Sequence, residues 1–181
     1  IKSNIDILFS HNDLLDIQKR PTNNFKAYEL VLAATNLSIS GSDRKFVVEG
    51  KPLLEQALEL DPTYSDALAL MGLIALLDYT SKEDHLYNSG KYINSLKIGI
   101  DYSNQSLEYN STHPLGLALA ILIPIILMQE ESAWFGGDIP TTKLAQMAYT
   151  MRSVAVKAKT MAKAHPESPY AKTIIGLFHF F

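Results

Sequence analysis

Few side chains of this sequence could perform acid–base chemistry, and those that could lie near the ends of expected helices. Glu130, Glu131 and Asp138 are close together in the chain, and paired carboxylates can serve as a general acid and base. No phosphate-binding glycine loop, GxSxG sequence or HExxH sequence accompanies them. We therefore interpret these carboxylates as the polar end of a helix, and we expect no catalytic residues.

Two histidines could bind a metal, but each stands in a turn. His113 and His165 both precede a proline, as Asp61 does. A turn or capping role explains all three positions better than metal coordination. The chain has no cysteine, which excludes disulfides, thiolate catalysis and zinc–thiolate sites. The sequence thus predicts a protein that is not an enzyme and that has neither a metal site nor a cofactor.

Positive charge gathers in residues 143–163, which contain no acidic residue. Arg152, Lys159 and Lys163 share one helical face there, and they could contact a phosphate, an anionic headgroup or an acidic partner. We interpret this face as the solvated outer side of a helix. The net charge of −3 does not predict nucleic-acid binding. Trp134, the only tryptophan, is expected in a loop packed on the core, with a ligand anchor as the alternative.

The elements that must position these residues are all helices. Helix formers with apolar residues at a 3.6-residue period recur along the chain, and glycine- or proline-containing breakers separate them. No segment combines strict apolar–polar alternation with hairpin turns. With 181 residues, of which 47% are hydrophobic, the chain can bury a sizeable core. The sequence predicts an all-α fold.

The most apolar segment, residues 115–128, carries no polar side chain. A bilayer span needs about 20 apolar residues, and runs of 10–14 are typical of buried helices. We therefore expect a core helix without a membrane span. Thr112 or His113 should lie near its N-cap, and Pro124 should bend it near Ala120.

Three X-Pro turns indicate an internal repeat. They lie 52 residues apart, and ten residues after each proline stands a small or special residue. The prolines are Pro62, Pro114 and Pro166, followed by Gly72, Pro124 and Gly176. We interpret the turns as marking successive helix pairs.

The segment from Gly50 to Gly72 resembles the tetratricopeptide repeat (TPR) family. Gly50, Leu54, Ala57 and Pro62 match the second helix and turn of that repeat, and Gly72 and Gly176 match the Leu-Gly position of its first helix. The resemblance implies antiparallel helix pairs stacked as an α-solenoid. The expected pairs lie near 25–61, 62–113 and 114–165, with a partial pair at 166–181, after an N-terminal segment or linker at 1–24.

A narrower resemblance covers residues 21–181. "RPTNNFKAYELVLAA" and "LLEQALELDPTYSDALALMG" resemble the TPR regions of bacterial class III adenylate cyclases and of HilA- and CadC-type transcriptional regulators. This likeness implies a non-catalytic sensory or protein-interaction module of a regulatory protein. A third likeness, to TPR-like proteins associated with TRAP transporters, implies a helical solute-binding or transport-accessory protein with an apolar pocket.

The TPR resemblance also implies a groove lined by the first helix of each pair. The groove positions carry almost no charge, which favours an apolar small ligand, an amphipathic partner helix or another domain of the same protein. Extra helices covering these residues are the alternative, and a homo-oligomer is compatible with either. The sequence leaves the compartment open between bacterial cytoplasm and periplasm. The expected binding residues are Tyr28, Val31, Leu73, Leu77, Ile121, Ile125, Met128 and Leu177.

Overall fold

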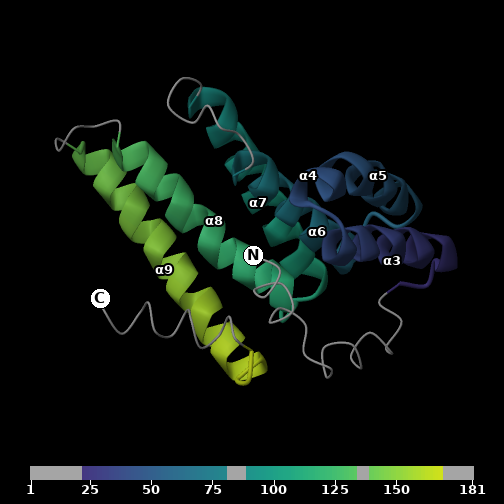
Figure 1. The fold of residues 1–181 in the computed structure, drawn as a ribbon. Coiled ribbons are helices and arrows are strands. Elements are labelled where there is room, and N and C mark those ends of the chain that lie inside the picture. Colours follow the sequence, from purple (N-terminus) through teal and green to yellow (C-terminus); the bar gives the residue numbers. More distant parts are fainter. Residues whose placement is uncertain (1–21, 81–88, 134–138, 169–181) are drawn as a thin grey trace.

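The structure, a computed structural model, describes residues 22–80, 89–133 and 139–168 (Figure 1). All regular secondary structure in these ranges is helical, which confirms the all-α prediction. The elements are α3 (Phe25–Ser40), α4 (Asp43–Lys45), a π-helical turn η1 (Phe46–Gly50), α5 (Lys51–Leu60), α6 (Ser65–Thr80), α7 (Ser89–Tyr109), α8 (Pro114–Ala133) and α9 (Thr141–Ala164).

The glycine-containing segment "SGSDRK" separates the first two helices only at Gly41 and Ser42, and its last three residues already begin the second helix of the first pair. The Ser42 hydroxyl accepts a hydrogen bond from the Lys45 backbone N–H and so caps this helix. Elements α4, η1 and α5 then follow without a break from Asp43 to Leu60. The π-helical turn brings the Phe46 ring against residue 50, where a Cβ would lie 2.6 Å from the ring. Gly50 is therefore required by a neighbour within its own helical segment.

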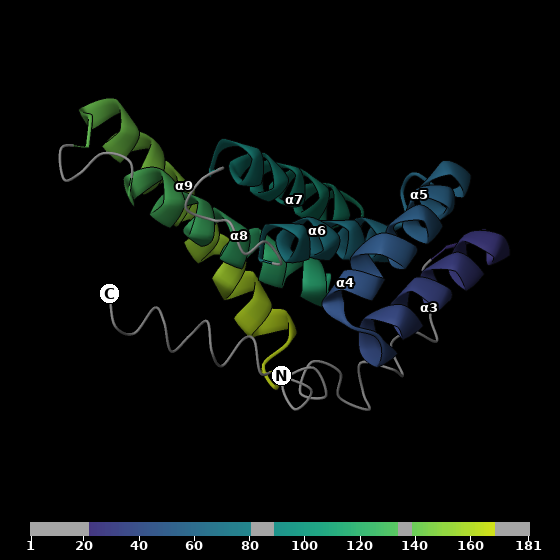
Figure 2. The same ribbon diagram turned by 45° about the horizontal axis from the view of Figure 1, so that its top comes forward.

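Consecutive helices form antiparallel hairpins. In the first, the Asn24 side chain donates to the Leu60 carbonyl, which joins the start of α3 to the end of α5. In the second, Ser106 donates to the Ser65 carbonyl and Ser95 donates to Asp78, so α6 and α7 run in opposite directions. In the third, the start of α8 packs against the end of α9, where Met161 is buried. Both views show α8 and α9 side by side (Figures 1 and 2).

The third hairpin packs on both helices of the second hairpin through its first helix, α8. α8 lies against both α6 and α7. Contacts between α6 and α8 advance together along both helices, from Asp66–His113 to Tyr79–Glu130, so these helices run parallel. Close approach depends on glycine, because a Cβ on Gly72 would lie 3.0 Å from the Ser103 Oγ of α7. The same Cβ would lie 3.4 Å from the Gly99 carbonyl oxygen, so the backbones of α6 and α7 approach closely at this point.

The apolar run forms most of α8 and is a core helix. Leu117 to Ile121 and Ile123 are buried, packed against α6, α7 and α9. No helix in the described ranges combines the length and the hydropathy that crossing a bilayer requires. His113 precedes the first residue of α8, and its Nδ1 accepts a hydrogen bond from the Gly116 N–H, which confirms the capping prediction. Pro124 lies buried inside the helix, and the predicted bend stays a prediction.

The turns that separate the hairpins show that the 52-residue spacing misaligns the second repeat. In the first turn, the backbone N–H and the hydroxyl of Thr63 both donate to Asp61 Oδ1. In the second, Thr112 makes the same two hydrogen bonds to Asn110 Oδ1. Asn110 is therefore the equivalent of Asp61, and Pro114 is the first residue of α8, whereas Pro62 lies inside the turn before α6.

This correction moves the equivalent positions in α8 by three residues. The turn residues are 49 apart, so Ile121 rather than Pro124 takes the place of Gly72. The third turn keeps the form of the first, since the Ser168 N–H donates to the His165 carbonyl as the Tyr64 N–H does to that of Asp61. Pro62 and Pro166 are thus equivalent turn residues, and Pro114 is not.

Candidate functional site

The first helix of each hairpin carries the expected binding residues, and the structure divides them into accessible and buried side chains. Leu73 and Leu77 of α6 are half-buried, as are Ile125 and Met128 of α8 and Tyr28 of α3. Val31 is only 5% exposed and belongs to the core of the first hairpin. We call four of the partly exposed apolar side chains of α6 and α8 the first-helix face, namely Leu73, Leu77, Leu122 and Ile125.

Ile121 was expected to be a binding residue, but it is buried. Its exposed fraction is 2%, and its side chain packs between α8 and α9, so it is not available to a partner. Its neighbour Leu122 is 45% exposed. The three-residue shift explains the burial of Ile121, because aligning Asp61 with Asn110 puts Ile121 in the place of buried Gly72. The same shift moves the equivalent of Leu73 from Ile125 to Leu122. Sequence reasoning missed Leu122, although the paired Asp-x-Thr and Asn-x-Thr sequences could have identified it.

The first-helix face is poor in charge. No charged residue occurs in α8 before Glu130, and α6 carries only Asp66 and Asp78. In α3, Lys26 and Glu29 lie 3.4 Å apart and form a pair with each other. An uncharged apolar face of this kind stabilises contacts with apolar side chains and does not attract a peptide carboxylate.

Polar contacts in the turns hold successive hairpins in register. His113 Nδ1 faces the Gly116 N–H and accepts from it, so the ring hydrogen is on Nε2, which donates to Asp66 Oδ1 at 2.6 Å. The His165 ring likewise donates through Nε2 to the Thr112 carbonyl of the preceding turn. His113 links its turn to α6 of the previous hairpin, and His165 links its turn to the turn before α8.

Asp61 makes the corresponding contact in the first turn. Thr22 donates to its Oδ2 at 2.6 Å, and Thr63 donates to its Oδ1. Burial raises the pKa of Asp61, but these hydrogen bonds to the charged carboxylate outweigh it and leave the pKa below its usual range. The turn roles predicted for Asp61 and His113 are therefore confirmed.

Two tyrosines near the first-helix face are held in their neutral form. Burial raises the pKa of Tyr79 to about 12, and its hydroxyl donates to Glu130 Oε1 at 2.6 Å. Burial also raises the pKa of Tyr64 well above its usual range, and Asp66 adds to this effect. Glu130 therefore links α8 to α6, which goes beyond the polar helix end expected from the sequence.

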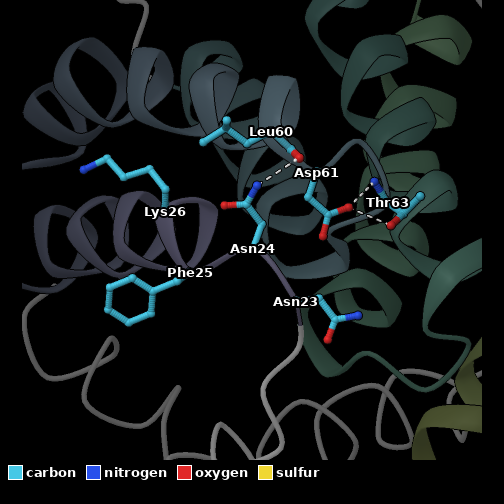
Figure 3. A pocket seen from close by; sticks show the side chains of 7 residues that line it. All are labelled: Asn23, Asn24, Phe25, Lys26, Leu60, Asp61 and Thr63. Atoms are coloured by element: carbon cyan, nitrogen blue, oxygen red, sulfur yellow. Dashed lines mark hydrogen bonds between the residues drawn. The ribbon is translucent and has the colours of Figure 1, made fainter.

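A shallow, open depression lies beside the start of α3 (Figure 3). Polar side chains at the start of α3 and in the first turn surround it. The Asn24 side chain is hydrogen-bonded to the Leu60 carbonyl and Asp61 to Thr63, and the Phe25 ring points away from both pairs. The Asn24, Asp61 and Thr63 side chains are already engaged in capping and turn hydrogen bonds. The depression is thus explained by helix ends. Its lining residues are Asn23, Asn24, Phe25, Lys26, Leu60, Asp61 and Thr63.

Several expected residues fall outside the described ranges. They are Trp134, Asp138, Gly176 and Leu177. Within the described residues, no group of three or more His, Asp and Glu side chains is placed to hold a metal ion. Every buried polar side-chain atom described has a hydrogen-bond partner.

Comparisons with known proteins add no relative. The chain matches no protein-family model, no curated protein and no solved structure. The resemblance to TPR proteins therefore rests on the residues quoted above.

Proposed function

We propose that this chain is a non-catalytic, TPR-like α-solenoid that binds an amphipathic segment of another protein or domain on its first-helix face, as the interaction or sensory module of a bacterial regulatory protein. The parallel packing of α6 against α8 carries the proposal. It is the relationship that stacked helix pairs create between successive first helices, and it sets Leu73 and Leu122 in equivalent positions of neighbouring repeats.

The polarity of the helices supports the choice of this face. The second helices are charged, since α7 carries both lysines and acids and α9 carries lysines and an arginine, whereas α8 is uncharged as far as Gln129. Leu122, in the middle of this helix, has an exposed fraction of 45%, and half-buried Ile125 lies three residues after it. Apolar side chains accessible on adjacent parallel helices form the kind of surface on which the apolar side of a partner helix can pack.

The solute-binding alternative would need an enclosed apolar pocket. The depression beside α3 is open and has mainly polar lining residues, so it does not favour that alternative.

The test uses Nile red, an uncharged apolar dye, with a net-neutral amphipathic helical peptide as competitor. We expect saturable dye fluorescence that the peptide displaces. Leu122→Glu should abolish both effects. Ile98→Glu is the matched control, because Ile98 is 42% exposed and lies on the second helix α7. Dye binding that the peptide cannot displace would favour a small-solute site, and equal effects of the two variants would refute the first-helix face as the site.

A further inference from the structure

The outer side of α9 carries a straight stripe of exposed side chains. Tyr149, Arg152, Val156, Lys159 and Lys163 are all exposed, and they follow one another at spacings of three, four, three and four residues. We call these five residues the α9 stripe. The opposite side of the helix, with Val154, Ala158 and Met161, is buried against α8. The stripe is therefore a separate surface from the core-facing side of α9.

The apolar members of the stripe are largely exposed. The exposed fraction is 77% for Tyr149 and 60% for Val156. They stand seven residues apart, which is two helical turns, so both point to the same side of α9. An aromatic and a β-branched side chain in this setting leave apolar area in water that a partner would cover.

The cations of the stripe are not paired with the acidic side chains that the structure describes. No carboxylate of the described residues forms a salt bridge with Arg152, Lys159 or Lys163. Lysines of the first hairpin differ, since Lys45 lies 3.9 Å from Glu49 and Lys51 lies 3.8 Å from Glu55. α9 itself contains no acid. Three uncompensated positive charges on one side of one helix attract an acidic partner.

The spacing of the stripe favours another α-helix as its occupant. Alternation of three and four residues gives a period of 3.5, which keeps a seam straight along a partner helix. A membrane surface is less suited, because the large apolar side of α9 faces α8 and the stripe itself offers only Tyr149 and Val156 to lipid. Nucleic acid is disfavoured by the chain's net charge of −3.

We propose that the α9 stripe is a docking site for an acidic amphipathic helix of a partner protein. Carboxylates of that helix meet Arg152, Lys159 and Lys163, and its apolar side chains pack on Tyr149 and Val156. The site lies on a second helix and is independent of the proposed use of the first-helix face.

The probe is a fluorescein-labelled synthetic peptide of three heptads, with leucine at the first position and glutamate at the fourth position of each heptad. Fluorescence anisotropy with the full chain should show saturable binding that weakens as salt is added, because exposed ion pairs are screened. A peptide of the same composition in scrambled order should bind at least tenfold more weakly. Equal binding of the two peptides, or no binding of either, would overturn the proposal.

Two sets of variants assign the binding to the stripe. R152Q/K159Q/K163Q should weaken binding about tenfold, as expected for the loss of three exposed ion pairs. K26Q/K45Q/K51Q removes the same charge elsewhere and should leave binding unchanged. Tyr149→Ser should weaken binding several-fold without lowering the thermal midpoint, since its side chain is exposed.

A vesicle experiment separates the protein partner from a membrane. Vesicles of phosphatidylserine and phosphatidylcholine should not compete with the peptide or sediment with the chain. Sedimentation that R152Q/K159Q/K163Q abolishes would overturn the proposal in favour of a lipid surface. Loss of peptide binding in both glutamine variants would also overturn it, because total charge rather than the stripe would then govern binding.

Discussion

The Nε2 atom of His113 lies 2.6 Å from Oδ1 of Asp66, and this hydrogen bond joins the turn before α8 to the first turn of α6. The same ring caps α8 through Nδ1 and the Gly116 N–H. One side chain thus starts a helix and aligns it with its parallel neighbour. His113 is 6% exposed, so little water competes for either contact.

Replacing His113 should separate these two roles. His113→Ala should lower the free energy of unfolding by about 2–3 kcal/mol, because it removes a cap and a buried hydrogen bond. His113→Asn should cost about 1 kcal/mol less, since asparagine can cap the helix but cannot reach Asp66. Urea unfolding of the wild type, of each single variant and of Asp66→Ala with His113→Ala should give a coupling energy of about 1–2 kcal/mol. Additive effects would show that the contact contributes nothing.

The TPR-like register of α5 can be tested at two adjacent residues. Ala57 has no exposed surface, whereas Gln56 is exposed on the same helix. Ala57→Asp should destabilise the protein by about 3 kcal/mol or more, because it buries an unpaired charge. Gln56→Asp adds the same side chain and should change the stability by less than about 0.5 kcal/mol. Thermal unfolding followed by circular dichroism measures both, and similar midpoints would contradict the burial pattern.

The lowered pKa of Asp61 makes part of the stability depend on pH. A lowered pKa in the folded chain means that the charged carboxylate stabilises the fold above about pH 4, and that this contribution is lost as the pH falls through the folded pKa. Thr22→Val should cost about 0.5–1 kcal/mol at pH 7, a small value because Asp61 is partly exposed. The difference should disappear once Asp61 is protonated. Thr22→Ser keeps the hydroxyl and is the control, and a pH-independent loss in Thr22→Val would argue against the linkage.

Close approach of α7 and α8 can be tested by adding a methyl group at Gly99 and removing the one that it would meet. A Cβ on Gly99 would lie 2.9 Å from Ile123 Cδ1. Gly99→Ala should therefore destabilise the protein by about 1–2 kcal/mol, despite the higher helix propensity of alanine. Ile123→Val removes that Cδ1 atom, so the double variant should be about 1 kcal/mol more stable than the sum of the single effects. Denaturant unfolding of all four proteins provides the measurement, and simple additivity would place the clash elsewhere.

Much of the fold could be predicted from local patterns. The apolar periods and the breakers located the helices from α5 to α9, because helix formation and burial depend mainly on residues three and four apart. The length of the apolar run in α8 identified a core helix for the same reason. The second helix begins as early as Asp43 because Ser42 caps it, and it continues past residue 50 because glycine there accommodates the Phe46 ring.

The candidate site was harder to predict. Counting prolines gave a 52-residue repeat, in which Ile125 is the equivalent of Leu73. The hydrogen bonds of Thr63 and Thr112 give 49 residues instead, which makes Leu122 the equivalent of Leu73 and Ile121 the equivalent of buried Gly72. Apolar residues occur on several sides of α9, so its sequence could not show that Tyr149 and Val156 are the exposed ones. Only packing against α8 distinguishes them from Val154 and Met161.

By itself, the sequence determined an all-α chain with a buried apolar helix at its centre, since helix propensity and hydrophobic period are properties of neighbouring residues. The tertiary structure decided which helical sides stay accessible and how the hairpins align. Those features depend on contacts between residues about 50 positions apart, such as Asp66 with His113 and Tyr79 with Glu130. Such contacts form only when the packed helices bring distant side chains within hydrogen-bonding distance.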